Sequence, residues 1–265
     1  MTLNTPDSSA ANSSSLPLAY QRLLALERFK SGFLARTSHE LRSPINTIVS
    51  LHQLILEDLC EDPEEEKEFI GQSKDAALKM LALFDQITAV SKLDIGREPA
   101  KLEAVDLSLL LPEVEMLTTL QAANQNIRYS VELPAEELEI YTDAKWLKNL
   151  LVSLIQDAIP KTKFLSVSVS QAEQSITIVI KSDRDPEALQ ADLDAIANAE
   201  ALPDAVTPVQ TADSIELTTG LVLATAHIAL PLINGEFAIA RQHTAPENSE
   251  HSSQHGSELR CLFTK

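Results

Sequence analysis

The chain has 265 residues, of which 44% are hydrophobic and only 4% aromatic, and its formal net charge at pH 7 is −18. This length and hydrophobic content predict one large domain or two smaller ones, with cores made mainly of aliphatic side chains. The negative charge repels nucleic-acid phosphates and anionic lipid headgroups, so we expect neither nucleic acid nor membrane among the partners.

The sequence also favours a cytoplasmic location. No apolar run reaches the roughly 18 residues needed to cross a bilayer, and the N-terminus lacks the pattern of a secretory signal. The two cysteines, Cys60 and Cys261, are far apart and form no metal or redox motif. A reducing compartment is therefore the expected one.

Residues 1–16 are rich in Ser, Asn and Thr and lack periodicity, which predicts a disordered tail. Two long helices are predicted next, within 17–97. The first has a heptad seam, with spacings of alternately 4 and 3, at Leu34, Ser38, Leu41, Ile45, Ile48, His52, Ile55 and Leu59. The second has a similar seam at Phe69, Ser73, Ala76, Met80, Leu83, Ile87 and Val90.

The two seams are joined by a short acidic turn and predict an antiparallel helical hairpin. A single hairpin leaves an apolar stripe exposed, so we expect two copies to close into a four-helix bundle. We therefore expect a homodimer.

The remainder, 103–265, mixes helices and strands and predicts an α/β sandwich, so that the whole chain is of α+β class. Helices are expected at 107–124, 144–159 and 219–233, and strands at 127–133, 139–143, 164–171, 175–182, 235–242 and 258–265. The acidic, alanine-rich segment 185–213 is expected to be a long mobile excursion. Three histidines near the C-terminus, His243, His251 and His255, are too loosely spaced to indicate a metal site.

The stretch "TSHELRSPI", 37–45, carries reactive groups on the first helix. His39 follows a seam position by one residue, which turns it about 100° away from the buried stripe toward solvent. An exposed imidazole is a competent nucleophile near neutral pH, and Glu40 can accept its proton or orient its ring. Ser43 lies one turn further along the same face. Pro44 has no N–H for the carbonyl of Glu40, so we expect a kink just beyond the histidine.

The longer stretch "FLARTSHELRSPINTI", 33–48, resembles the H-box of sensor histidine kinases, with Ser43 at the position of the usual threonine. The resemblance implies that His39 is the phospho-acceptor and that 17–97 is the dimerisation and histidine phosphotransfer domain. It also implies that Glu40 is a general base and that Ser43 positions a water that attacks a phospho-aspartate. Receiver domains of response regulators are the implied partners.

The resemblance extends to 103–265, which is similar to the ATP-binding (GHKL, or Bergerat) domain of these kinases but altered at its nucleotide boxes. Asp157 stands where the family has the asparagine that holds Mg²⁺, and Ser182 is the in-phase counterpart of the adenine-binding aspartate. Gly220 is what remains of a glycine-rich box, with Thr218 and Val222 in place of its companions. No cofactor is therefore certain, and ATP and Mg²⁺ are expected only if this altered site still functions.

The favoured interpretation is a phosphotransferase or pseudokinase that exchanges phosphoryl groups between His39 and regulator aspartates. Two alternatives remain open. One is a soluble divergent histidine kinase or regulator phosphatase that still uses ATP, and the other is a non-catalytic scaffold that binds a regulator. Nucleotide binding separates the first interpretation from the second, and substitution of His39 separates both from the third.

Overall fold

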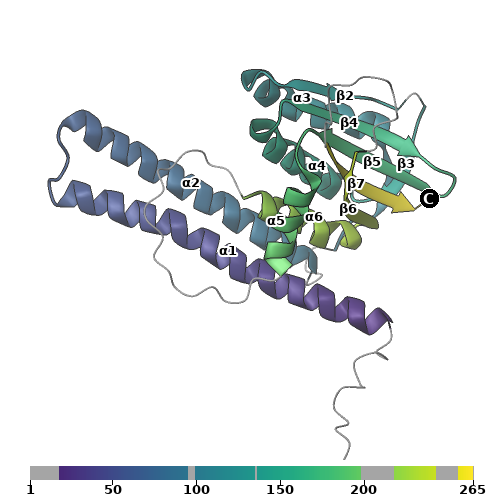
Figure 1. Ribbon diagram of the computed structural model, residues 1–265, viewed down its shortest axis with the longest axis horizontal. Coiled ribbons are helices and arrows are strands. Elements are labelled where there is room, and N and C mark those ends of the chain that lie inside the picture. Colours follow the sequence, from purple (N-terminus) through teal and green to yellow (C-terminus); the bar gives the residue numbers. More distant parts are fainter. Residues whose placement is uncertain (1–17, 95–98, 135, 198–217, 243–255, 265) are drawn as a thin grey trace, which may run out of the picture.

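The computed structural model describes residues 18–94, 99–134, 136–197, 218–242 and 256–264 (Figure 1). The predicted tail at 1–16 lies outside the described residues. So do the three histidines near the C-terminus and residues 198–213 of the predicted excursion.

The N-terminal part is a helical hairpin, as predicted. Helix α1 (Leu18–Leu56) and helix α2 (Pro63–Asp94) lie side by side and extend away from the rest of the molecule (Figure 1). Asp62 caps α2, because its Oδ1 accepts hydrogen bonds of 2.9 Å from the backbone N–H groups of Glu64 and Glu65. Three glutamates in the first turn, Glu64, Glu65 and Glu66, add a favourable charge at this positive helix end.

The two predicted seams differ in how far they are buried. Three seam residues of α2 are buried, namely Ser73, Ala76 and Leu83. In α1 the buried stripe contains Phe29, Phe33, Thr37, Pro44 and Leu51 instead, whereas the predicted seam residues Leu34 and Ile45 are 56% and 44% exposed. The predicted seam of α1 is thus partly exposed, although Leu41 packs against the core and His52 lies 3.1 Å from the hydroxyl of Ser73 on α2.

The C-terminal part, which we call the shell, is built on a five-stranded sheet of order β2-β4-β5-β7-β6. All neighbouring strands are antiparallel except β2 and β4. The strands are β2 (Arg128–Val131), β4 (Phe164–Gln171), β5 (Ser175–Ser182), β6 (Gly235–Arg241) and β7 (Ser257–Thr264). A separate ribbon joins β1 (Glu103–Asp106) to β3 (Glu139–Thr142), and β1 was not predicted.

Helices pack against this sheet. They are α3 (Leu107–Asn124), α4 (Ala144–Ala158), the short 3₁₀ helix η1 (Ile159–Lys161), α5 (Pro186–Ala197) and α6 (Thr219–Leu232). The bounds of α3 and of strands β4 and β5 agree with the prediction residue for residue. Asp143 caps α4 by accepting a 3.0 Å hydrogen bond from the N–H of Trp146. These observations confirm the predicted α/β sandwich.

Helix α5 corrects the prediction for 185–213, because residues 186–197 are helical rather than an excursion. Pro186 occupies the first helical position, where its missing N–H does no harm, and Asp185 accepts a 3.0 Å hydrogen bond from the N–H of Glu187. Leu189, Leu193 and Ile196, spaced by 4 and 3, are all buried. The amphipathic pattern thus outweighs the acidic composition of this segment.

The hairpin and the shell share one connected core. Phe29, Phe33 and Leu83 of the hairpin belong to the same buried cluster as the apolar residues of α5 and α6. These two helices lie between the sheet and the hairpin (Figure 1). The ring of His227 on α6 contacts that of Phe29, with 4.7 Å between the ring centroids and a tilt of 45° between the ring planes. Among the described helices, none is long and apolar enough to span a bilayer.

Candidate functional site

The H-box lies within α1, on the half of the hairpin that the shell contacts. His39 is part of this helix, but its side chain is outside what the structure describes. Arg36 and Glu40 form an ion pair of 2.9 Å across one turn, and the Glu40 side chain is only 11% exposed. Ser43, one turn beyond His39, is exposed. The ion-paired carboxylate of Glu40 is thus adjacent to the His39 position, and the exposed hydroxyl of Ser43 lies one turn further along the same helix.

Pro44 does not end the helix. α1 continues through it to Leu56, and Pro44 itself is buried in the hairpin. Its missing N–H still leaves the Glu40 carbonyl without the usual helical donor. Pro44 and Leu51, on either side of the following turns, are both buried. α1 is thus continuous through this turn, and the kink expected beyond His39 stays a prediction.

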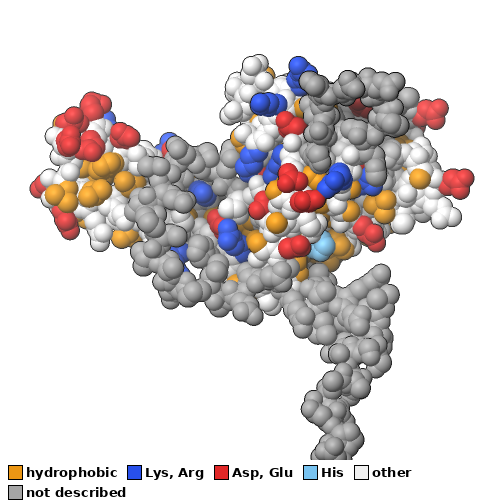
Figure 2. Space-filling model, viewed as in Figure 1, with side chains coloured by type: hydrophobic (Ala, Val, Ile, Leu, Met, Phe, Trp, Pro, Cys, Tyr) orange, Lys and Arg blue, Asp and Glu red, His pale blue; other side chains and the backbone are white. Residues whose placement is uncertain are grey.

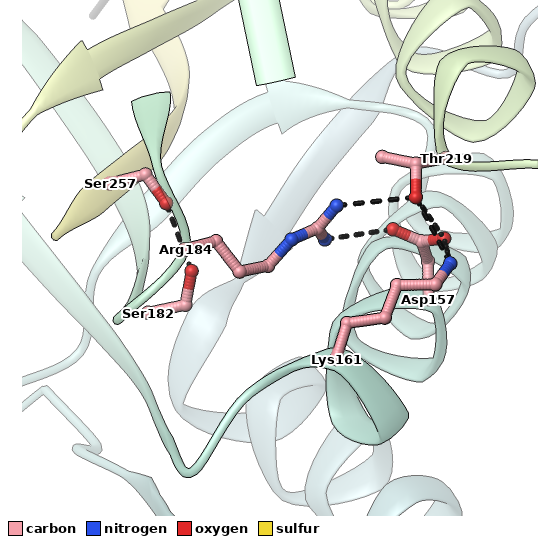
Figure 3. A network of polar contacts seen from close by, with 6 residues as sticks. All are labelled: Asp157, Lys161, Ser182, Arg184, Thr219 and Ser257. Carbon is pink, nitrogen blue, oxygen red and sulfur yellow. Dashed lines mark hydrogen bonds and ion pairs between the residues drawn. The ribbon is translucent and has the colours of Figure 1, made fainter. Parts of the chain in front are cut away.

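The position of the family's magnesium-binding asparagine is occupied by a closed network around Asp157 (Figure 3). Lys161 Nζ donates to Asp157 Oδ1 at 2.5 Å, and Arg184 donates to Oδ2 at 2.9 Å. The Thr219 hydroxyl donates to Oδ1 at 3.0 Å and accepts from both cations, at 3.0 Å from Lys161 and 3.2 Å from Arg184. Only 4% of the Asp157 side chain is exposed. Both of its oxygens are thus paired within the chain.

Ser182, the predicted counterpart of the adenine-binding aspartate, is not brought into this network. It is buried at the end of β5, and its hydroxyl is 2.9 Å from that of Ser257 on β7. Figure 3 shows this serine pair apart from Asp157, with Arg184 reaching across toward the network. Because position 182 is a serine, it offers no carboxylate to the adenine amino group. Its hydroxyl is already hydrogen-bonded to the neighbouring strand.

Gly220, in the first turn of α6, makes a close contact with α5. A Cβ placed on Gly220 would lie 2.8 Å from the carbonyl oxygen of Asp192, closer than real Cβ atoms approach. The absence of a side chain therefore serves helix packing at this position. The backbone of α5 therefore packs against the side of the first turn of α6.

The residues present do not fit a magnesium–nucleotide group. Asp157 is fully engaged with two cations, Ser182 offers no carboxylate, and α5 covers Gly220. Asp157 and Gly220 do lie close together, because Thr219, the neighbour of Gly220, bonds to Asp157. Of the three residues predicted to bind a nucleotide, the structure thus brings Asp157 and Gly220 together and leaves Ser182 apart from them. Protein side chains and backbone contact both Asp157 and Gly220.

Sequence reasoning missed Lys161, Arg184 and Thr219 as partners of Asp157. One signal was available, because Lys161 follows Asp157 by four residues, the spacing of an ion pair along a helix. Arg184 and Thr219 come from segments 27 and 62 residues away in the chain. Their meeting depends on how α6 and the end of β5 pack beside α4.

Comparison with known proteins agrees with the motif. Residues 29–96 match the His Kinase A (phospho-acceptor) domain. The chain is 30% identical over 150 residues to the Aerobic respiration control sensor protein ArcB of Escherichia coli (strain K12), covering 55% of this chain and 19% of ArcB. It is 28% identical over 160 residues to the Non-motile and phage-resistance protein of Caulobacter vibrioides, covering 59% of this chain and 18% of that protein. These findings place 29–96 in the His Kinase A (phospho-acceptor) domain family and support a two-component sensor histidine kinase family for the chain.

It spans about a fifth of the length of these relatives. Solved structures share the fold at low identity. Acinetobacter baumannii histidine kinase AdeS has a TM-score of 0.57 at 16% identity, covering 85% of this chain and 97% of AdeS. Histidine kinase ThkA, in complex with response regulator protein TrrA, has a TM-score of 0.53 at 17% identity, covering 94% of this chain and 64% of ThkA. The hairpin followed by a mixed sheet is thus the family's arrangement.

Proposed function

We propose that this protein is a histidine phosphotransferase of two-component signalling. His39 takes a phosphoryl group from the aspartate of one response-regulator receiver domain and passes it to another. The observation that carries the proposal is a contrast between the two parts of the chain. The H-box keeps its histidine, glutamate, arginine and proline, whereas the nucleotide position is filled by the Asp157 network and by α5.

The chemistry needs only the side chains of the H-box and the phospho-regulator. The unprotonated imidazole nitrogen of His39 attacks the phosphorus of an aspartyl phosphate. An N–P bond forms, the acyl P–O bond breaks, and the regulator's aspartate leaves as a carboxylate. Glu40 takes the proton from the other ring nitrogen, and its ion pair with Arg36 keeps this carboxylate next to the nucleophile's turn. Transfer to a second aspartate reverses these steps.

In this proposal 17–97 is the dimerisation and phosphotransfer domain, and 103–265 supports it and helps dock the regulator. Figure 2 shows hydrophobic side chains gathered on the outward end of the hairpin, beside its acidic turn. Exposed large apolar residues lie on both helices and together supply the stripe that a second hairpin would cover: Leu34, Ile45, Val49, Leu56, Ile70, Leu78, Leu81 and Phe84. We therefore propose a homodimeric four-helix bundle.

The dimer is tested by placing a charge on this stripe. Ile45→Glu is expected to shift the sedimentation profile from dimer to monomer, because a glutamate in an apolar bundle core loses its hydration without gaining a partner. Glu57→Gln, at the exposed turn, serves as the control and should leave the dimer intact. A wild-type chain that sediments as a monomer at tens of micromolar would contradict the proposed bundle.

The phosphotransfer proposal is tested without nucleotide. A panel of receiver domains is phosphorylated with radiolabelled acetyl phosphate, purified, and mixed with the full chain. Label is expected to move to the chain in the acid-labile, alkali-stable form of phosphohistidine, and His39→Gln should abolish it. His52→Gln is the matched control, since His52 lies on the same helix and bonds to Ser73 of α2 at 3.1 Å.

Other outcomes would select the alternatives. Label acquired directly from ATP and lost in His39→Gln would make the protein a working kinase. Loss of regulator phosphate to water, abolished by Ser43→Ala, would make it a phosphatase. Failure of transfer from every receiver domain in the panel would refute the proposed phosphotransferase.

A further inference from the structure

The network around Asp157 has the composition of an anion-binding site that already contains its anion. We infer that the Asp157 carboxylate is the built-in occupant of a two-cation site at the start of α6, in place of the phosphates of a nucleotide. The inference deepens the proposed function. It rests on one part of it, namely that Asp157 and Gly220 lie where the related kinases hold a nucleotide.

Two cations converge on one carboxylate. Lys161 and Arg184 contact different oxygens of Asp157, at 2.5 and 2.9 Å, and both also contact the Thr219 hydroxyl. A lysine, an arginine and a hydroxyl at a helix start are the donors that proteins use to hold phosphate oxygens. Without Asp157, this set would bind an external anion.

Burial makes the internal anion difficult to displace. The side chain of Asp157 is 4% exposed and that of Arg184 is 10% exposed. Leaving a buried charge without a partner is strongly unfavourable, so the two groups stay together once they are buried. Asp157 is also tethered, and an external anion must compete with a partner whose effective concentration is at least of millimolar order. Free phosphates at cellular concentrations would therefore leave the pair intact.

Helix α5 packs against the same helix start and is a separate constraint on it. A Cβ on Gly220 would lie 2.8 Å from the carbonyl oxygen of Asp192, so the backbone of α5 packs against the first turn of α6. Leu193 and Ile196 are buried in the core that α5 shares with the hairpin, which holds the helix in this position. The first turn of α6 is thus packed against α5, next to the Thr219 hydroxyl that bonds to Asp157.

The inference predicts a gain of binding when the carboxylate is neutralised. Asp157→Asn keeps the shape of the side chain and frees Lys161 and Arg184. We expect the full-length variant to bind inorganic pyrophosphate at least about tenfold more tightly than the wild type by isothermal titration calorimetry. Asp183→Asn removes the same charge from the same region, but Asp183 bonds to Thr162 and to the backbone N–H of Lys163 rather than to the two cations, so this control should gain nothing.

A double variant shows which cation captures the ligand. Asp157→Asn combined with Arg184→Gln should lose most of the gained affinity for pyrophosphate. Equal binding of pyrophosphate by the wild type and Asp157→Asn, at whatever strength, would overturn the inference. A gain that survives Arg184→Gln undiminished would overturn it as well, because the anion would then be held elsewhere.

A measurement on the unmutated chain covers the case in which Asp157→Asn does not fold. The carboxyl ¹³C resonance of Asp157 is followed while pyrophosphate is added to the wild-type protein. The resonance should not shift in a saturable way up to about 10 mM pyrophosphate, since the internal anion outcompetes the added one. A saturable shift at low millimolar concentration would overturn the inference. Phosphotransfer to His39 is measured without nucleotide, so failure of either proposal is seen independently of the other.

Discussion

The contact between Gly220 and α5 allows a sharp test by adding one methyl group. In Gly220→Ala the new Cβ would stand 2.8 Å from the Asp192 carbonyl oxygen, which is backbone and cannot rotate away. Overpacking of this kind costs about 1–3 kcal/mol, whereas replacing a helical glycine by alanine contributes about 1 kcal/mol of stability. We therefore expect Gly220→Ala to be between neutral and about 2 kcal/mol less stable than the wild type.

Gly71→Ala is the matched control. Gly71 lies in the interior of α2, and a Cβ there would meet nothing within 4 Å. The same change should therefore stabilise the protein by about 1 kcal/mol through helix propensity alone. The difference between the two variants, about 1–3 kcal/mol, isolates the contact with α5.

Urea unfolding of both variants measures these free energies at one protein concentration, since the proposed dimer would make stability concentration-dependent. Far-UV circular dichroism reports on the whole chain, and the single tryptophan, Trp146 on α4, reports on the shell. Coincident transitions from the two probes justify a two-state analysis. If Gly220→Ala were as stabilising as Gly71→Ala, the space in front of Gly220 would be open and the argument that α5 fills it would be wrong.

Three further predictions concern buried groups. Burial raises the pKa of the Cys261 thiol to about 12, so a thiol reagent at pH 8 should label only the half-buried Cys60 in the native protein; equal labelling of both would refute this. Thr142→Val removes a 2.7 Å hydrogen bond to the carbonyl of Ile233 and should cost about 1–3 kcal/mol in urea unfolding, against no change if that carbonyl finds another donor. Burial lowers the pKa of His227 below its ordinary value of about 6.5, so the unfolded chain takes up its proton first and stability should fall as pH drops below about 6.5; His227→Gln should show a smaller fall, and an unchanged pH dependence would contradict the prediction.

Much of the fold follows from local signals in the sequence. The hairpin and strands β4 and β5 were predictable because their apolar residues recur with the period of a helix or of a strand. The H-box could likewise be located as a contiguous motif on one helix. Helix α5 was missed because acidic residues and Pro186 dominate its composition, and the spacing of its three buried apolar residues was the weaker signal.

The sequence alone located the helix that carries the H-box, since its motif and its heptad spacing are both properties of neighbouring residues. It also indicated that the nucleotide boxes had changed, through Asp157, Ser182 and the lost glycines. Only the tertiary structure decided what surrounds Asp157 and Gly220. Arg184 and Thr219 reach Asp157 because a sheet and two helices bring distant segments together, and α5 covers Gly220 because its apolar face is buried against the hairpin. Such contacts depend on packing between elements, which no periodicity within one element records.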